Sequence, residues 1–370
     1  MPPAIPLLHR EFGISAVTAA WLLSIFSAIG AFAGIGFGTI ADRFGRRRAV
    51  VGGLALVALA SIAGGFVNNA TALVILRGIE GFGFVTAVVA IPALITSLTA
   101  ERDRRLALGL WSAYVPLGSA IVLFCAPLAI AAGGWRALWF FAGGFAAVMA
   151  IVAAGTRDAS EPARVSHQTS LVNDVRAVVS APYPLALAAG FAGYTAGYLA
   201  LVGFLPAMLV DAGVTVDDAA VATAIVVLAN AFGNLAGALL AHRFARWVIV
   251  VIGAVLMGGG AATLYAHGLP LPVRYTAAFI AALCGGAIPA AVMASVPLFA
   301  PAPRLVATTQ GLIVQGSSIG QLCGPVLVVA AGGMRGAGGS IVMASFASVC
   351  IAAAMILRRP EEARPQEVQA

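Results

Sequence analysis

The sequence predicts an all-α membrane protein built from two similar halves that run in the same direction. Composition is the first observation: 61% of the residues are hydrophobic and 9% are charged, whereas soluble domains carry about 25% charged residues. The second observation is a repeat, because residues 6–46 and 206–246 are two copies of one segment, offset by 200 without a gap. The matched positions include Pro6 with Pro206, Gly13 with Gly213, Ile25 with Ile225, and Phe32 with Phe232.

Eleven apolar stretches are long enough to cross the ~30 Å hydrocarbon core of a bilayer. Five lie before a polar linker, at about 16–40, 49–67, 71–99, 106–130 and 135–154. Six follow it, at about 183–209, 216–240, 246–266, 272–299, 305–331 and 337–357. We therefore expect an N-terminal bundle at 1–154, a cytoplasmic linker at 155–182, a C-terminal six-helix bundle at 183–357 and a cytoplasmic tail at 358–370. The linker belongs in water because it holds Arg157, Asp158, Glu161, Arg164, His167, Asp174 and Arg176.

The arginines indicate the orientation of these helices. If the loop at 41–48 is cytoplasmic, strict alternation leaves only Arg10, Arg136, Arg274 and Arg335 on the outer side. This bias is strong under the positive-inside rule. It predicts a multi-pass protein of a bacterial-type inner membrane with a cytoplasmic C-terminus. The pI near 9.8 then reflects membrane topology, and we expect no nucleic-acid partner.

All 21 basic residues are arginine, and the lack of lysine excludes several functions. A phosphate-binding P-loop needs a lysine, and so do retinal and pyridoxal Schiff bases. Each of the four cysteines lies within an apolar stretch, where a thiol behaves as a small hydrophobic group. No Cys or His pair stands at metal-ligand spacing. We therefore expect no enzyme activity, no cofactor, no metal and no disulfide.

The loop between the first two apolar stretches carries a family resemblance. Residues 38–48 read GTIADRFGRRR, which resembles the signature loop G-x-L-A-D-R-x-G-R-[RK] of the major facilitator superfamily, with Ile40 in place of Leu. The resemblance implies the fold of that family, two pseudo-symmetric helical bundles. It also implies that this loop is a cytoplasmic gate in which Asp42, Arg43 and Arg46 form a charge relay. The residues of the gating motif are Gly38, Asp42, Arg43, Gly45, Arg46 and Arg47. The alternative is that the arginines only anchor the topology.

A second family motif, R-x-x-x-G-x-G, matches Arg77 and the segment that follows it to Gly83. Arg77 and Glu80 are charges placed well inside the membrane, where a charge costs at least ~2.5 kcal/mol, so both are functional candidates. Their spacing of three puts them on one helical face. Either they form a mutually neutralised structural pair, or they are functional: Arg77 receives an anionic substrate, or it keeps Glu80 ionised until a proton is taken up, and the two events compete. By resemblance, this arginine takes part in proton coupling.

Glycine and polar positions supply further candidates. Glycines spaced by four on a helix indicate that another helix packs closely against it. Two stretches, 16–40 and 305–331, carry such glycines, and by resemblance they pack against each other between the two halves. The contact is either a surface that slides during transport or static packing. These glycines are Gly30, Gly34 and Gly38, and then Gly316, Gly320 and Gly324. Candidate cavity-lining residues, each of which could instead be an interhelical hydrogen bond, are Trp111, Tyr114, Tyr194, Thr195, Tyr198, Asn230, Asn234, Gln310, Gln315 and Gln321.

The repeat also predicts a missing helix. Under the 200-residue offset, the stretch 183–209 aligns mostly with positions before Met1. We therefore expect eleven helices of the family's twelve, either because the true start lies upstream or because the first helix is lost. In the second case, a receptor or scaffold that does not transport is an alternative function.

The preferred function is secondary active transport of a small organic solute by alternating access. Arg77 favours an organic anion as the substrate. The expected partners are the lipid bilayer, the small-molecule substrate and protons, and we expect a monomer. Proton-coupled efflux of drugs or amphipathic compounds is the alternative. The family's antiporter signature G-x-x-x-G-P-x-x-G-G is not intact on 106–130, and its first half appears instead at 320–325, which weakens the efflux assignment.

Overall fold

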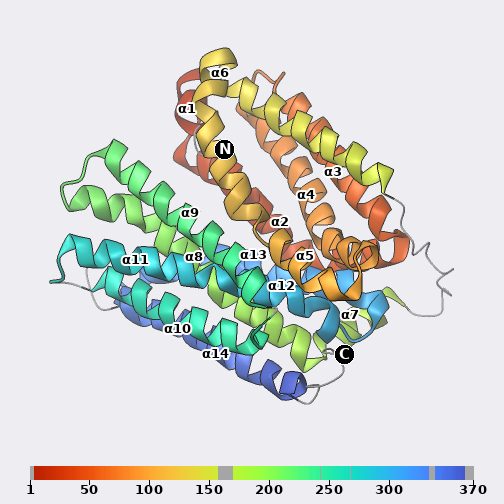
Figure 1. The fold of residues 1–370 in the computed structure, drawn as a ribbon. Helices are drawn as coiled ribbons and strands as arrows, with labels where there is room; N and C mark the ends of the chain where they lie inside the picture. The colour runs from red at the N-terminus through yellow and green to blue at the C-terminus, as the bar shows by residue number, and fades with distance from the viewer. Residues whose placement is uncertain (1–3, 157–169, 242, 267, 333–337, 363–370) are drawn as a thin grey trace. The chain divides into compact units, whose positions relative to one another are not determined.

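The computed structural model describes residues 4–156, 170–241, 243–266, 268–332 and 338–362, and these form helices joined by short turns (Figure 1). The first half of the chain contains α1 (Ile5–Phe12), α2 (Ala16–Phe44), α3 (Arg46–Gly64), α4 (Ala70–Leu98), α5 (Arg104–Trp111) and α6 (Tyr114–Gly155). The linker contains α7 (Leu171–Val179). The second half contains α8 (Pro182–Asp211), α9 (Val216–Leu240), α10 (Arg246–Tyr265), α11 (Leu271–Gly285), α12 (Ala287–Phe299), α13 (Val306–Ala330) and α14 (Gly338–Glu362).

Ten helical segments within the described ranges are long and apolar enough to cross a membrane. The sequence predicts eleven, and the two counts differ because the predicted stretches 106–130 and 135–154 share one long helix, α6, of which Cys125–Gly155 counts as a single span. The stretch 106–130 is itself interrupted at Ser112 and Ala113, so that α5 ends and α6 begins. The next break lies inside α6, where Gly133 and Gly134 leave helical geometry. The stretch 272–299 is also broken, between α11 and α12, but still counts as one span.

The predicted repeat is confirmed in the local geometry of both copies. Gly13 and Gly213 each have a positive φ, of 60° and 90°, just before a long helix begins. Ser15 then caps α2, with its side chain accepting a hydrogen bond from the backbone N–H three residues later. Thr215 caps α9 in the same way. The glycine with positive φ follows the end of one helix and the hydroxyl N-cap starts the next, and the chain uses this combination twice.

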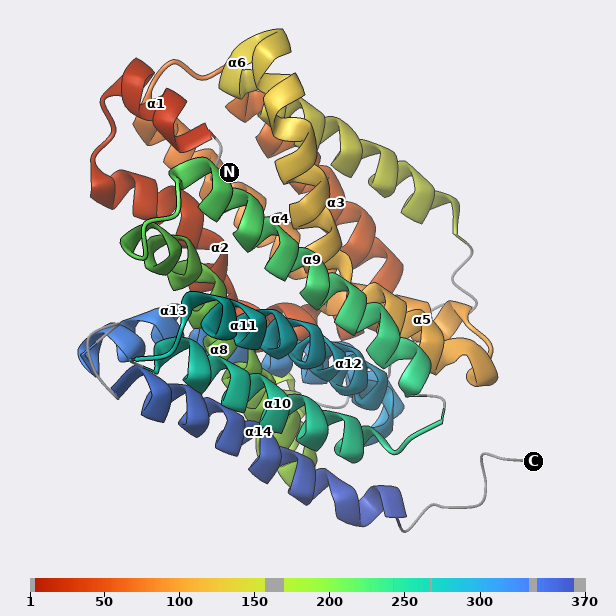
Figure 2. The ribbon, with the colours of Figure 1, turned by 60° about the vertical axis from the view of Figure 1, so that its left-hand side comes forward.

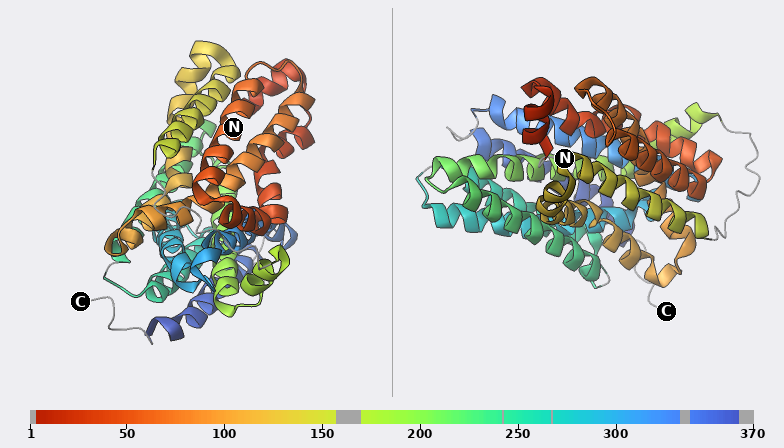
Figure 3. Two further views of the ribbon diagram at one scale, coloured as in Figure 1. Left: turned by 90° about the vertical axis from the view of Figure 1, so that its right-hand side faces the viewer. Right: turned by 90° about the horizontal axis from the view of Figure 1, so that it is seen from above.

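The residues group into two compact units. Unit 1 comprises Met1–Leu98, Ile121–Ala177 and Ala302–Gln315, and unit 2 comprises Thr99–Ala120, Val178–Pro301 and Gly316–Ala370. In unit 1, α4 packs against both α2 and α3 (Figure 3). In unit 2, α10 lies against α11 and α14, and α8 lies against α14 (Figure 2). These units, which group residues by their contacts, differ from the two halves of the sequence repeat. The predicted domain boundaries therefore stay a prediction.

The linker contains a helix that the sequence analysis does not predict. Helix α7 is mostly exposed, but Asp174 and Val178, which lie four residues apart on one helical face, are buried. The expectation of a wholly solvated linker therefore fails at Asp174. The linker residues Arg157, Asp158, Glu161, Arg164 and His167 lie outside the described residues.

Candidate functional site

The loop between α2 and α3 is a single-residue turn at Gly45. This glycine has φ +102° and serves as both the last cap of α2 and the first cap of α3. A side chain would be strained in that conformation. Two arginines directly follow the turn: Arg46 donates to the carbonyl oxygen of Pro303 at 2.8 Å, and Arg47 donates to the carbonyl oxygen of Ala154.

Asp42, one turn before this glycine, caps a helix that lies far away in the sequence. Its Oδ1 accepts from the backbone N–H of Ala307 at 3.2 Å, and its Oδ2 accepts from the backbone N–H of Thr308 at 2.7 Å and from the Thr308 hydroxyl at 2.8 Å. Ala307 and Thr308 lie in the first turn of α13. Backbone N–H groups there have no partner within their own helix and carry the positive end of its dipole. A carboxylate is therefore well matched to this position.

Asp174 of α7 is a second buried acidic residue near the α2–α3 loop, where it binds Arg43. Its Oδ2 accepts from Arg43 at 2.8 Å and its Oδ1 from Arg304 at 2.6 Å, and the residue is only 4% exposed. Burial by itself raises the pKa of Asp174, but the hydrogen bonds and positive charges of Arg304 and Arg43 outweigh it and hold the pKa below its usual range. The sequence did not predict a role for Asp174, because a single acidic residue in a polar linker is expected to lie in water.

The glycines of α2 allow the backbone of this helix to contact the backbone of α13 directly. A methyl group on Gly34 would lie 2.7 Å from the carbonyl oxygen of Gly311, and one on Gly38 would collide with the backbone of Ala307. The second glycine series has a different neighbour. Gly316, Gly320 and Gly324 instead lie against the backbone of α8, at Ala188, Ala192 and Ala196. Gly30 is buried.

Arg77 and Glu80 form a buried ion pair on α4, as their spacing predicts. Arg77 is 9% exposed and Glu80 is 1% exposed, and Arg77 Nη1 donates to Glu80 Oε2. The Ser61 hydroxyl donates to Glu80 Oε1 at 2.7 Å, so both carboxylate oxygens have a donor. The Arg77 guanidinium lies 4.1 Å above the ring of Phe26, and its Nε donates to the carbonyl oxygen of Leu22 at 3.4 Å. Ser61 was not predicted.

Several predicted cavity-lining residues are engaged in hydrogen bonds between helices of unit 2. Asn230 donates to the Tyr194 hydroxyl at 3.1 Å and to the carbonyl oxygen of Ala282 at 3.0 Å. The Thr195 hydroxyl lies 3.0 Å from the carbonyl oxygen of Ser317. Asn234 pairs with Ser112. Of the three glutamines, Gln310 is buried, Gln315 is half-buried, and Gln321 donates to the Ser317 hydroxyl at 3.2 Å.

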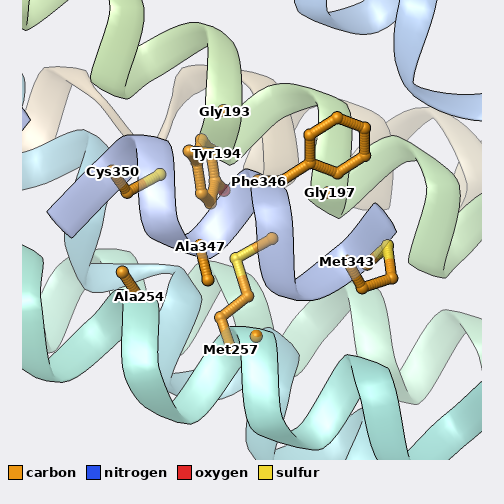
Figure 4. Close-up of a pocket in the computed structure, with 10 residues that line it drawn as sticks. Gly193, Tyr194, Gly197, Ala254, Met257, Met343, Phe346, Ala347 and Cys350 are labelled. Atoms are coloured by element: carbon orange, nitrogen blue, oxygen red, sulfur yellow. The ribbon is translucent and has the colours of Figure 1, made fainter. Parts of the chain in front are cut away.

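The aromatic candidates form two stacks in unit 2. Trp111 and Tyr114 stack across the α5–α6 break with ring centroids 4.9 Å apart. Tyr194 stacks on Phe191 and on Tyr198 along α8, with centroids 5.8 Å apart in both pairs. An apolar cavity of about 10 Å³ lies beside Tyr194, bordered by Met257, Met343, Phe346 and Cys350 (Figure 4). This volume holds at most one water molecule, so the cavity is no substrate site.

Comparison with known proteins agrees with this architecture. A family model described as the Major Facilitator Superfamily matches residues 1–216. The multidrug resistance protein Stp of Mycobacterium tuberculosis is 28% identical over 138 residues, which is 37% of this chain and 26% of that protein. The 4-hydroxybenzoate transporter PcaK of Pseudomonas putida is 29% identical over 147 residues, 40% of this chain and 33% of that protein. The crystal structure of the transporter FucP, in the outward conformation, superposes with a TM-score of 0.78 at 17% identity, covering 96% of this chain and 93% of FucP.

Proposed function

Because the chain belongs to the Major Facilitator Superfamily, we propose that it is a proton-coupled secondary active transporter of a small organic solute, working by alternating access. The observation that carries this proposal is the buried ion pair of Arg77 and Glu80 with Ser61. The proposed location is the inner membrane, with the C-terminus in the cytoplasm, in keeping with the placement of the arginines.

The ion pair supports coupling because neither charge is stable there alone. Removing one partner of a buried pair typically costs about 3–5 kcal/mol, since the other charge is left uncompensated. A proton taken up by Glu80 would free Arg77, and an anionic substrate could then compensate the Arg77 charge. Proton and anion binding would thus favour each other, as co-transport of the two requires.

An organic anion, such as a carboxylate, is the substrate class that this exchange favours. The likeness to a 4-hydroxybenzoate transporter over a third of that protein's length supports it. Efflux of drugs is the second candidate, and the likeness to the multidrug resistance protein Stp supports that. The two candidates differ in the charge of the solute and in the direction of transport.

Proteoliposomes with a pH-sensitive dye in the lumen would test the proposal. Addition of 4-hydroxybenzoate or another aromatic carboxylate to wild-type proteoliposomes should acidify the lumen faster than it does in protein-free liposomes, which control for passive entry of the weak acid. If ethidium causes proton movement and none of the carboxylates does, the result would favour drug efflux. The absence of solute-dependent proton movement with both classes would contradict proton coupling.

We also propose that Asp42 works as a lock that opens and closes during transport, rather than only as part of a topology anchor. Asp42→Asn keeps the shape of the side chain but loses the charge that binds the first turn of α13. Transport should therefore fall at least about tenfold, because a hydrogen bond to a charged group contributes about 1.5–3 kcal/mol. Insertion should persist, since the arginines that set the topology remain. Wild-type transport by an inserted Asp42→Asn protein would leave the loop as an anchor alone.

A further inference from the structure

The break between α5 and α6 has a specific chemical cause and a specific partner. In a continuous helix, the carbonyl oxygen of Ser112 would accept from the N–H of residue 116, but that residue is Pro116 and has no N–H. Asn234 of α9 supplies the missing donor: its Nδ2 donates to the Ser112 carbonyl oxygen at 3.1 Å. Its Oδ1 lies 2.5 Å from the Ser112 hydroxyl. Ser112 is 5% exposed and Asn234 is 1% exposed.

The backbones of α5 and α9 lie close together beside this pair. A methyl group on Gly109 would lie 2.8 Å from Cα of Ala238, so the two helices are in direct contact there. Helix α5 comes from the first half of the sequence and α9 from the second. The hydrogen-bonded pair of Ser112 and Asn234 therefore joins the two halves of the repeat within unit 2.

The repeat relates this contact to the one between α2 and α13 in unit 1. The offset of 200 places Gly38 at Ala238, and an offset of 198 aligns Gly118, Ser119, Cys125 and Pro127 with Gly316, Ser317, Cys323 and Pro325. That second offset places Gly109 at Ala307. Gly38 packs on Ala307, and Ala238 packs on Gly109. The two helix pairs are therefore copies of one contact, with the glycine on opposite sides.

The polar groups at the two copies differ. The α2–α13 contact is held by the carboxylate of Asp42 on the first turn of α13. In the second copy, the sequence places His242 at the position of Asp42. Among the described residues, which do not include His242, the hydrogen bonds of this contact lie two turns earlier on α9, at Asn234, and join neutral groups.

We propose that Ser112 and Asn234 are positioning residues that form an uncharged lock between α5 and α9, the counterpart of the Asp42 lock between α2 and α13. This inference rests on the proposed transport function, because alternating access requires both contacts to separate. The chemistry suits a reversible lock. The Ser112 hydroxyl also lies 2.5 Å from the carbonyl oxygen of Gly109 in its own helix, so the hydroxyl keeps an acceptor when Asn234 leaves.

Thiol labelling tests this lock without a substrate or a proton gradient, so its outcome is independent of the coupling mechanism. The reporter is Leu108→Cys, because Leu108 lies on α5, is 1% exposed and is larger than cysteine. It is introduced into a protein in which the native thiols are replaced by serine, at Cys125, Cys284, Cys323 and Cys350. The rate of labelling by a water-soluble maleimide reports how often α5 separates from its neighbours.

Asn234→Leu should raise the labelling rate about three- to tenfold, the effect of losing an interhelical hydrogen bond in a membrane protein. Ser112→Ala, which removes one hydroxyl, should raise it in the same direction and remains available if Asn234→Leu does not fold. Asn230→Leu is the matched control, because Asn230 lies on the same helix, is equally buried, and bonds to Tyr194 and Ala282, which both belong to the second half. Labelling that is unchanged in Ser112→Ala, or that rises equally in Asn230→Leu, would overturn the lock.

Discussion

At the scale of single residues, the buried charged side chains form specific ion pairs. Arg77 and Glu80 could be predicted from the sequence, because an intramembrane charge is rare and their spacing of three places them together. Ser61, which completes the set of donors to Glu80, could not. A serine in an apolar helix usually bonds to its own backbone, and nothing in the sequence pairs α3 with α4.

Stability measurements on the ion pair test whether its charges depend on each other. Arg77→Leu should lower the free energy of unfolding by about 3–5 kcal/mol, since Glu80 is left charged and unpaired in an apolar setting. The double variant Arg77→Leu/Glu80→Leu should recover most of that loss, because two apolar side chains replace a buried pair at little cost. Thermal unfolding in detergent checks this. Additive losses in the double variant would show that the two residues do not interact.

Asp174 predicts a particular pH dependence. Its pKa is lower in the folded protein than the usual value of about 3.9, so its contribution to stability is fully present above that value and is lost as pH falls through the lowered pKa. Asp174→Asn should therefore melt below the wild type by a constant margin from pH 8 to pH 5, and the margin should shrink below about pH 4. A margin that already shrinks between pH 8 and pH 6 would contradict the assignment to Asp174.

At the scale of helices, the sequence predicts the long spans well and the breaks poorly. The predicted range 216–240 is that of α9, and α10, α13 and α14 begin within one residue of prediction. The break after α5 carries a signal, because Pro116 leaves the Ser112 carbonyl oxygen without its helical donor. The break at Gly286 has a different origin: the glycine fits against the backbone of Asn230 and Asn234, and that neighbour is invisible in the sequence.

The α2 glycines give a matched pair of substitutions for the contact with α13. Gly38→Ala should destabilise the protein and weaken transport, because the added methyl group meets the backbone of Ala307. Gly36→Ala on the same helix has nothing within 4 Å, and should stabilise the helix by about 0.5–1 kcal/mol through its propensity. Thermal unfolding of both variants makes the comparison. Similar shifts in the two would show that close approach at Gly38 is not required.

At the scale of the whole molecule, the duplicated sequence accounts for the architecture. Both copies start with the same glycine and hydroxyl cap, and the fold matches that of a solved transporter across almost the whole chain. The partners of each helix lay beyond prediction. Apolar patterning tells which segments enter the bilayer, but lipid-facing and protein-facing residues are equally apolar there, so the pattern does not say which helices touch.

The central claim is that Glu80 carries the coupled proton, and one comparison in proteoliposomes tests it most directly. Transport of a solute that moves protons in the wild type is measured in two assays, exchange and accumulation, with the variant Glu80→Gln. Glutamine keeps the shape of the side chain but cannot ionise. Exchange of labelled for unlabelled solute should persist, while accumulation driven by a pH gradient should be lost. Accumulation by Glu80→Gln at the wild-type level would contradict the account.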